Sequence, residues 1–160
     1  MSGHLPTSHS FYSQRLRLQF VEWGNTKAPT IVFVHGVRDH SRTWDDVLKY
    51  FVDDYHIVAP DLRGHGDSEW VNGSGYDFLD YLYDLYQLIV QNDYGPVCLV
   101  GHSLGGAITS FFAGTYPELV SKLVVIEGIG LWQRHATELS LGKKLRTWVE
   151  TTQSLADRQP

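Results

Sequence analysis

Apolar residues along the chain gather in short runs that are separated by amphipathic stretches. From Gln14 to Trp23 apolar and polar residues alternate, which predicts a hairpin or two short half-buried strands. Continuous apolar runs rich in β-branched residues then follow at 30–34, 56–59, 97–100 and 123–126. Runs of this kind are typical of strands that are buried on both faces of a parallel sheet.

The stretches between these runs have the periodicity of helices. Apolar residues recur at helical spacing over 44–51 and 77–91, and Asp77 can cap the second of these helices. A third helix is expected over 103–116, and it ends before Pro117, which cannot continue a helix. Buried strands that alternate with helices predict an α/β fold, a three-layer sandwich around a mostly parallel sheet.

The two ends of the chain lack this alternation. Residues 1–10 mix Ser, His, Gly and Pro and are expected to form a flexible tail, whereas 11–130 carry the core. Residues 131–160 contain no strand pattern, and 139–155 predict an amphipathic helix. A sheet that ends on the run at 123–126 would keep a bare apolar edge, which stable proteins avoid, so we expect a fold truncated after about six strands.

Composition narrows the class of protein. The 160 residues are 42% hydrophobic and 19% charged, which is typical of a globular chain. The net charge of −5 argues against nucleic acid or an anionic membrane as partner, because both bind basic surfaces. Cys98 is the single cysteine, so no disulfide can form within the chain, and neither a signal peptide nor a membrane-spanning run is visible. These features predict a cytoplasmic protein.

One segment has the pattern of an activated serine. Gly101-His102-Ser103-Leu104-Gly105 is a G-x-S-x-G motif that follows a buried run and opens a predicted helix. A serine on such a strained turn needs neighbours without side chains, so that strand and helix can approach each other. The free N–H groups at the start of the helix favour negative charge beside the serine.

A second segment can complete an oxyanion hole. Such a hole needs two backbone N–H donors that point at one position. His35-Gly36 ends the first buried run, and the loop after that run is a usual source of one donor. We expect Val37 to supply this donor and Leu104, directly after the serine, to supply the other.

These motifs together resemble the α/β-hydrolase superfamily, in particular small bacterial ester and carbon–carbon-bond hydrolases that carry a cap. The resemblance covers about residues 14–130 and includes a third motif, the 60–68 stretch Pro-Asp-Leu-Arg-Gly-His-Gly-Asp-Ser. It implies that Ser103 is the nucleophile and that Val37 and Leu104 are the oxyanion donors. The 60–68 stretch matches a turn that is usually structural, and 131–160 match the start of a cap or lid.

The resemblance also implies a histidine base and an acid that follow the serine in the chain. Of the histidines only His135 follows Ser103 by any distance, and it stands at the entrance of the cap. We therefore expect the catalytic histidine to be missing from this chain. Glu127 is a candidate acid, with a loop-anchoring carboxylate as the alternative, and Arg38, His40 and Trp132 are candidates for lining the substrate pocket.

The sequence thus predicts a serine hydrolase that acts on a small-molecule carboxylic ester through an acyl-enzyme on Ser103. Epoxide and haloalkane hydrolysis through alkyl-enzyme esters would need a carboxylate at position 103. No metal or organic cofactor is expected. Activity would require a missing C-terminal segment or a complementing chain, so residues 1–160 alone should be inactive. The alternative is a non-catalytic ligand-binding protein of the same fold, or an inactive fragment.

Overall fold

The first element of the described residues is an antiparallel hairpin. In the computed structural model, which describes residues 5–128, strand β1 (Thr7–Ser13) pairs with strand β2 (Leu16–Trp23). Gln14 and Arg15 form the turn between them with φ values of 49° and 70°. Two consecutive positive φ values are what a two-residue type I′ hairpin turn requires.

Strand β1 corrects the prediction of a flexible tail over residues 1–10. The tail prediction is wrong from Thr7 onward, and residues 1–4 lie outside the described residues. The sequence pattern did not predict this strand, for a physical reason. β1 is an edge strand whose first residues are polar and exposed, and only Phe11 and Ser13 within it are buried. Its turn also lacks the Gly or Asn that normally marks a type I′ turn.

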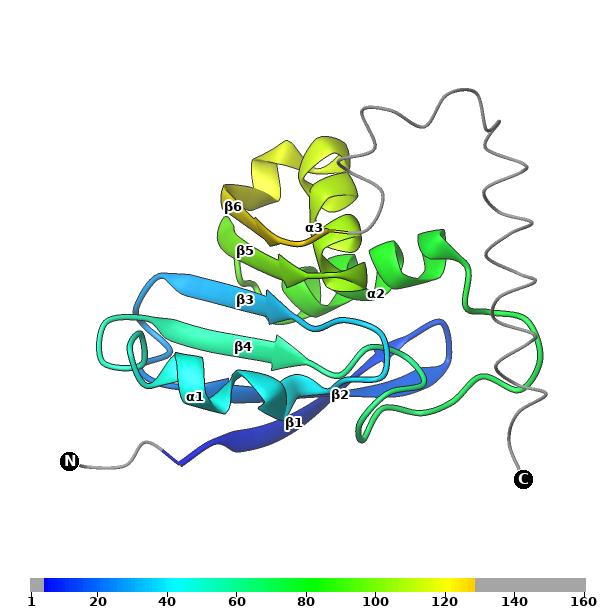
Figure 1. Ribbon diagram of the computed structural model, residues 1–160, viewed down its shortest axis with the longest axis horizontal. Coiled ribbons are helices and arrows are strands. Elements are labelled where there is room, and N and C mark those ends of the chain that lie inside the picture. The colour runs from blue at the N-terminus through cyan, green and yellow to red at the C-terminus, as the bar shows by residue number, and fades with distance from the viewer. Residues whose placement is uncertain (1–4, 129–160) are drawn as a thin grey trace.

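Within residues 5–128, four more strands join the same sheet. They are β3 (Thr30–Val34), β4 (His56–Pro60), β5 (Val97–His102) and β6 (Val120–Ile126). The strand order is β1-β2-β4-β3-β5-β6, in which β4, β3, β5 and β6 run parallel to one another. The arrowheads of β3, β4 and β5 point the same way in Figure 1, so the carboxyl ends of these strands share one edge of the sheet. The predicted mostly parallel sheet is confirmed.

Helices pack on both faces of this sheet. On one face α2 (Phe78–Gln91) and α3 (Leu104–Thr115) bury their apolar residues against Val32, Val58 and Leu99. On the other face a 3₁₀ turn, η1 (Ser41–Trp44), and the short helix α1 (Asp45–Leu48) cover Phe33 and Ile57. Alternate residues of the central strands therefore face opposite cores, and the predicted three-layer α/β sandwich is confirmed.

Most predicted helices are found where the sequence placed them. α2 begins after Asp77, whose backbone N–H donates to the Asp80 carboxylate at 3.0 Å in a capping box. The helix predicted over 44–51 is shorter than expected and is preceded by the η1 turn. The helix predicted over 139–155 and the cap predicted over 131–160 lie outside the described residues.

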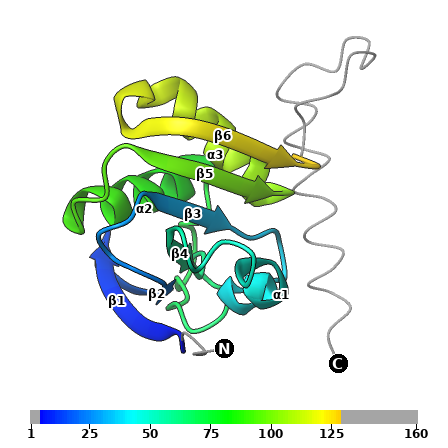
Figure 2. The ribbon, with the colours of Figure 1, turned by 90° about the vertical axis from the view of Figure 1, so that its left-hand side faces the viewer.

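Strand β6 is an exposed edge. It pairs with β5 on one side only within the described part of the chain, and Figure 2 shows it at the opposite edge of the sheet from β1. Leu123, Val124 and Ile126 are 39%, 47% and 42% exposed. The apolar edge that the sequence predicted at 123–126 is therefore present in residues 5–128. Within the same residues, no helix has the length and apolar character needed to cross a membrane.

Candidate active site

Ser103 lies on a sharp turn between β5 and α3. Its φ of 54° and ψ of −115° are sparsely populated for a residue with a side chain, and such strain is common at functional sites. The backbone around it is fixed on both sides. The Ser103 N–H donates to the carbonyl of Ile126 at 3.0 Å, and the Ser103 carbonyl accepts from Ala107 at 3.1 Å. The serine therefore ends a strand ladder and begins a helix, as the motif predicted.

Glycines allow this turn to be so tight. A Cβ on Gly101 would overlap the carbonyl of Gly105 and the hydroxyl of Thr109. A Cβ on Gly105 would overlap the backbone carbonyls of Val34 and His35. The predicted requirement for glycine two residues before and after the serine is thus confirmed by the close approach of β5, α3 and β3.

The loop after β3 lies against the serine. Val34 is paired with Gly101 in the parallel ladder, so the residues that follow each strand are neighbours. A Cβ on Gly36 would stand 3.0 Å from the Ser103 Cβ and 3.3 Å from Nδ1 of His102. Parallel sheets bind ligands at the carboxyl ends of strands where the strand order reverses, and β3 and β5 meet at such a point.

The two predicted oxyanion donors stand on the two sides of this junction. Leu104 is the first residue of α3, where backbone N–H groups have no partner within the helix. Val37 follows Gly36 and is 53% exposed. The expectation that both N–H groups point at one position beside Ser103 stays a prediction.

The imidazole of His35 is enclosed next to this loop. The ring is fully buried, with Nδ1 at 2.7 Å from the Gly36 carbonyl and Nε2 at 3.0 Å from the Leu62 N–H. Burial lowers the pKa of His35, and the nearby ring of His65 lowers it further, which outweighs the opposing effect of the bond to Gly36. His35 is therefore neutral at pH 7.

The 61–68 turn supports the same loop. One oxygen of the buried Asp61 carboxylate accepts from the Ser41 N–H at 2.6 Å, and the other accepts from the Asp67 N–H at 2.9 Å. The hydroxyl of Ser68 donates to the Asp61 carbonyl at 2.6 Å. The loop 36–41 is thus attached to this turn at its start, through His35 and Leu62, and at its end, through Ser41 and Asp61.

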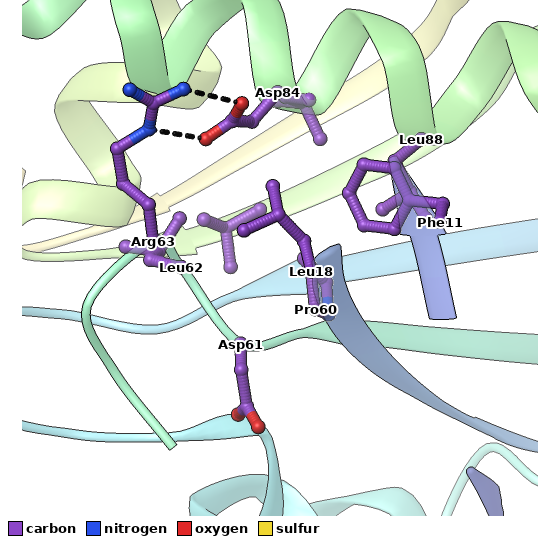
Figure 3. Close-up of a pocket in the computed structure, with 10 residues that line it drawn as sticks. Phe11, Leu18, Pro60, Asp61, Leu62, Arg63, Asp84 and Leu88 are labelled. Carbon is purple, nitrogen blue, oxygen red and sulfur yellow. Dashed lines mark hydrogen bonds and ion pairs between the residues drawn. The ribbon is translucent and has the colours of Figure 1, made fainter. Parts of the chain in front are cut away.

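Arg63 attaches the same turn to α2. Its guanidinium makes two parallel hydrogen bonds of 2.7 Å to Asp84, and both side chains are buried (Figure 3). Burial alone would lower the pKa of Arg63, but the hydrogen bonds and charge of Asp84 raise it, so the arginine stays charged. The adjacent cavity, between Phe11, Leu18 and Arg63, has a volume of about 10 Å³, which is room for about one water and not for a substrate.

No histidine in residues 5–128 hydrogen-bonds the Ser103 hydroxyl. The ring bonds of the described histidines go to other groups. His102 is half-buried beside the 36–41 loop, and His135 lies outside the described residues. Glu127, the candidate acid, follows β6 with φ of 48° and is exposed. The structure thus brings Glu127 to the carboxyl edge of the sheet without bringing a base to the serine.

The candidate substrate-binding residues differ in what the structure says of them. Arg38 is exposed in the 36–41 loop with φ of 61°. The His40 side chain accepts from the Arg42 N–H at 3.2 Å and caps η1, which gives it a local structural partner. Trp132 lies outside the described residues.

Sequence reasoning missed a polar cluster at the amino ends of the strands. Glu22 lies 2.9 Å from the His9 ring and 3.2 Å from the His56 ring, and Tyr94 donates to it. The Nδ1 of His56 lies 3.1 Å from the Thr30 hydroxyl. A cavity of about 380 Å³ borders this cluster. A signal was present, because Glu22 continues the apolar alternation of residues 16, 18 and 20 and so occupies an inward position.

Ionisation in this cluster follows from burial and contacts. Burial raises the pKa of Glu22, but hydrogen bonds from His56 and Tyr94 and the nearby histidine charges outweigh it and lower the pKa overall. Burial and the bond to Glu22 both raise the pKa of Tyr94. In the part of the chain that the structure describes, no three His, Cys, Asp or Glu side chains are arranged to hold a metal ion.

Comparisons with known proteins agree with this architecture. A (E)-2-((N-methylformamido)methylene)succinate hydrolase from Acinetobacter baylyi is 33% identical over 101 residues, which are 62% of this chain and 37% of that protein. The thioesterase domain from the curacin biosynthetic pathway has a TM-score of 0.77 at 25% identity, over 94% of this chain and 54% of that structure. An epoxide hydrolase from Bacillus megaterium has a TM-score of 0.70 at 32% identity, over 75% of this chain and 42% of that structure.

The chain spans between about a third and about half of the length of these relatives. The model of the family described as alpha/beta hydrolase fold matches residues 29–160, most of the chain. The chain therefore belongs to the alpha/beta-hydrolase fold family, and the strand order and the strained serine between β5 and α3 agree with this match.

Proposed function

We propose that this chain carries the nucleophile and oxyanion hole of a serine hydrolase that acts on carboxylic esters. Ser103 attacks the ester carbonyl while a base takes its proton, and the alcohol leaves with that proton as the acyl-enzyme forms. Water then hydrolyses the acyl-enzyme, which releases the acid and restores the serine hydroxyl. The N–H groups of Val37 and Leu104 stabilise the negative oxygen of the tetrahedral intermediate. No metal or organic cofactor takes part in this scheme.

The strained conformation of Ser103 is the observation that carries the proposal. A φ of 54° costs free energy that a purely structural turn could avoid with glycine. This conformation places the serine at the start of α3, where the helix dipole and free N–H groups favour an oxyanion. Gly101 and Gly105 give the backbone clearance that the turn requires.

The chemistry of serine favours an acyl substrate over an epoxide. Both a thioesterase domain and an epoxide hydrolase are similar in structure to this chain. Attack of a serine hydroxyl on an epoxide would give an ether, which water does not cleave under mild conditions. Attack on an acyl carbon gives an ester, which water can cleave with help from a base. Serine at position 103 therefore supports acyl transfer.

The proposal requires a base from outside residues 5–128, because no described histidine bonds the Ser103 hydroxyl. Later residues of the protein, or a complementing chain, would supply it. A serine hydroxyl without a base is a weak nucleophile. We therefore propose that residues 1–160 alone have almost no esterase activity, and that Glu127 is a candidate to orient the base.

The test is hydrolysis of p-nitrophenyl acetate by the full-length protein and by residues 1–160 in parallel. Ser103→Ala should lower kcat/KM of the full-length protein by about a thousandfold or more. The matched control is Ser110→Ala on the same helix, whose hydroxyl only donates to the Gly106 carbonyl at 2.7 Å and whose loss should leave activity unchanged. A fluorophosphonate probe should add its mass to the wild type and not to Ser103→Ala.

Three results would contradict the proposal or one of its parts. Equal turnover by the wild type and Ser103→Ala would place the nucleophile elsewhere. Binding of esters without turnover by the full-length protein would favour the alternative, a non-catalytic ligand-binding member of the family. Full-rate turnover by residues 1–160 would overturn the proposal that these residues alone are inactive, and His135 would then be the first candidate base to substitute.

A further inference from the structure

The proton on the His35 ring can be assigned from its two partners. A backbone N–H can only donate, so Nε2, at 3.0 Å from the Leu62 nitrogen, must accept and carries no hydrogen. A carbonyl can only accept, so Nδ1, at 2.7 Å from the Gly36 oxygen, must donate. The fully buried ring is therefore a neutral imidazole held in one tautomer by backbone groups on both sides.

The hydrogen bond to the Gly36 carbonyl fixes the orientation of the whole peptide unit between Gly36 and Val37. That carbonyl belongs to the same planar peptide unit as the N–H of Val37. The described residues contain no cis peptide bond, so the C=O and N–H of this unit point in opposite directions. Holding the Gly36 oxygen on the His35 side turns the Val37 N–H to the other side of the loop. The neighbouring Gly36 Cα is packed against Ser103, because a Cβ there would lie 3.0 Å from the Ser103 Cβ.

The 61–68 turn holds the imidazole of His35 in place through the Leu62 N–H. The Leu62 N–H occupies Nε2, which leaves Nδ1 as the only position for the ring proton. The neighbouring Asp61 carboxylate accepts from the Ser41 N–H at 2.6 Å and so fixes the far end of the same loop. A turn that the sequence marked as structural thus determines how the loop beside the nucleophile is held.

We propose that His35 is a positioning residue that orients the Val37 N–H toward the oxyanion site through the Gly36 carbonyl. The inference rests on the proposed serine hydrolysis at Ser103. The role it adds is to position a donor, and it requires no contact between His35 and the substrate. The imidazole does not touch the substrate and moves no proton. Its effect is on the transition state, in which the oxyanion needs a donor already in place.

Two substitutions separate this role from simple core packing. In His35→Asn the amide nitrogen stands near the position of Nδ1 and can still donate to the Gly36 carbonyl. In His35→Gln the longer amide can still accept from the Leu62 N–H but leaves the Gly36 carbonyl free. Each variant loses one buried hydrogen bond, so both should lose similar unfolding free energy in urea, about 1–3 kcal/mol.

Ester hydrolysis by the full-length protein should distinguish the two variants. His35→Gln should lower kcat about tenfold to a hundredfold, which is less than the loss of a whole donor, because the Val37 N–H is misdirected and not removed. His35→Asn should keep kcat within about threefold of the wild type, and KM should change little in both, because the effect is on the transition state. Equal loss of kcat in both variants, or loss that follows stability alone, would overturn the proposal.

A measurement on the unsubstituted protein covers the case in which a variant does not fold. Nitrogen-15 NMR of the imidazole side chains should show His35 with a protonated Nδ1 and a bare Nε2 at pH 7. A protonated Nε2 or a charged ring would overturn the proposal. Failure of the proposed function would look different: the full-length protein would show no ester turnover although His35 keeps the Nδ1–H tautomer. The proposed role of His35 would then fall together with the proposed function.

Discussion

The two ends of the parallel strands hold their polar groups in different ways. At the carboxyl ends His35, Asp61 and Arg63 are at most 4% exposed, and each has fixed hydrogen-bond partners. At the amino ends Glu22 is partly exposed, and the cluster around it borders a cavity of about 380 Å³. The first region is closed around its polar groups, and the second is open to a space that water can enter.

This difference sets how each region responds to change. Removing one partner of a closed polar pair leaves the other buried without compensation, which costs far more than the pair contributes. At the open end water can take the place of a lost partner. The carboxyl end can therefore hold a strained serine and its loop in fixed positions.

Breaking the closed region should have the largest effect. Arg63→Met leaves the Asp84 carboxylate, which is 4% exposed, without its arginine. We expect a loss of about 3–5 kcal/mol in unfolding free energy, measured with urea. The control is Arg42→Met, since the Arg42–Asp45 pair is 47% and 41% exposed, and it should change stability by less than about 1 kcal/mol. A loss in Arg63→Met no larger than in the control would contradict the comparison.

The second effect concerns backbone clearance at the serine turn. Gly105→Ala puts a Cβ onto the carbonyls of Val34 and His35, and neither can move without shifting β3. We expect a loss of about 1–3 kcal/mol and a fall in esterase activity of the full-length protein. Gly114→Ala on the same helix meets nothing within 4 Å and should be neutral or stabilising by up to about 1 kcal/mol. Equal unfolding midpoints for the two variants would contradict this prediction, because they would show that the turn has room for a Cβ at position 105.

The smallest effect is expected at the open end and depends on pH. The pKa of Glu22 is lower in the folded protein than in the unfolded chain, so folding at low pH requires the release of protons. Its contribution to stability is present above the unfolded value of 4.5 and is lost as the pH falls through the folded value. Glu22→Gln should cost about 1 kcal/mol at pH 7 and reduce the fall in stability as the pH drops below 4.5. Parallel pH profiles for the wild type and Glu22→Gln would contradict this.

The sequence predicted the elements whose signal is local. The apolar runs located β3, β4 and β5, the helical period located α2, and the serine motif with Pro117 located α3, with small errors at the helix ends. It failed for β1, because an edge strand with polar residues is stabilised by its ladder with β2 and not by its own composition. The Gly spacing around Ser103 predicted the strained turn, because backbone sterics there depend on adjacent residues.

The sequence by itself therefore determined the α/β class, the serine turn and the identity of its donors as candidates, since each follows from a local pattern. Only the tertiary structure decided which residues meet. It brought His35 to Leu62, Asp61 to Ser41 and Glu22 to His56 across separations of 20 to 34 residues, where no periodicity links the partners. Such contacts depend on the strand order, in which β3 lies between β4 and β5, and on the burial that makes each unpaired polar group costly.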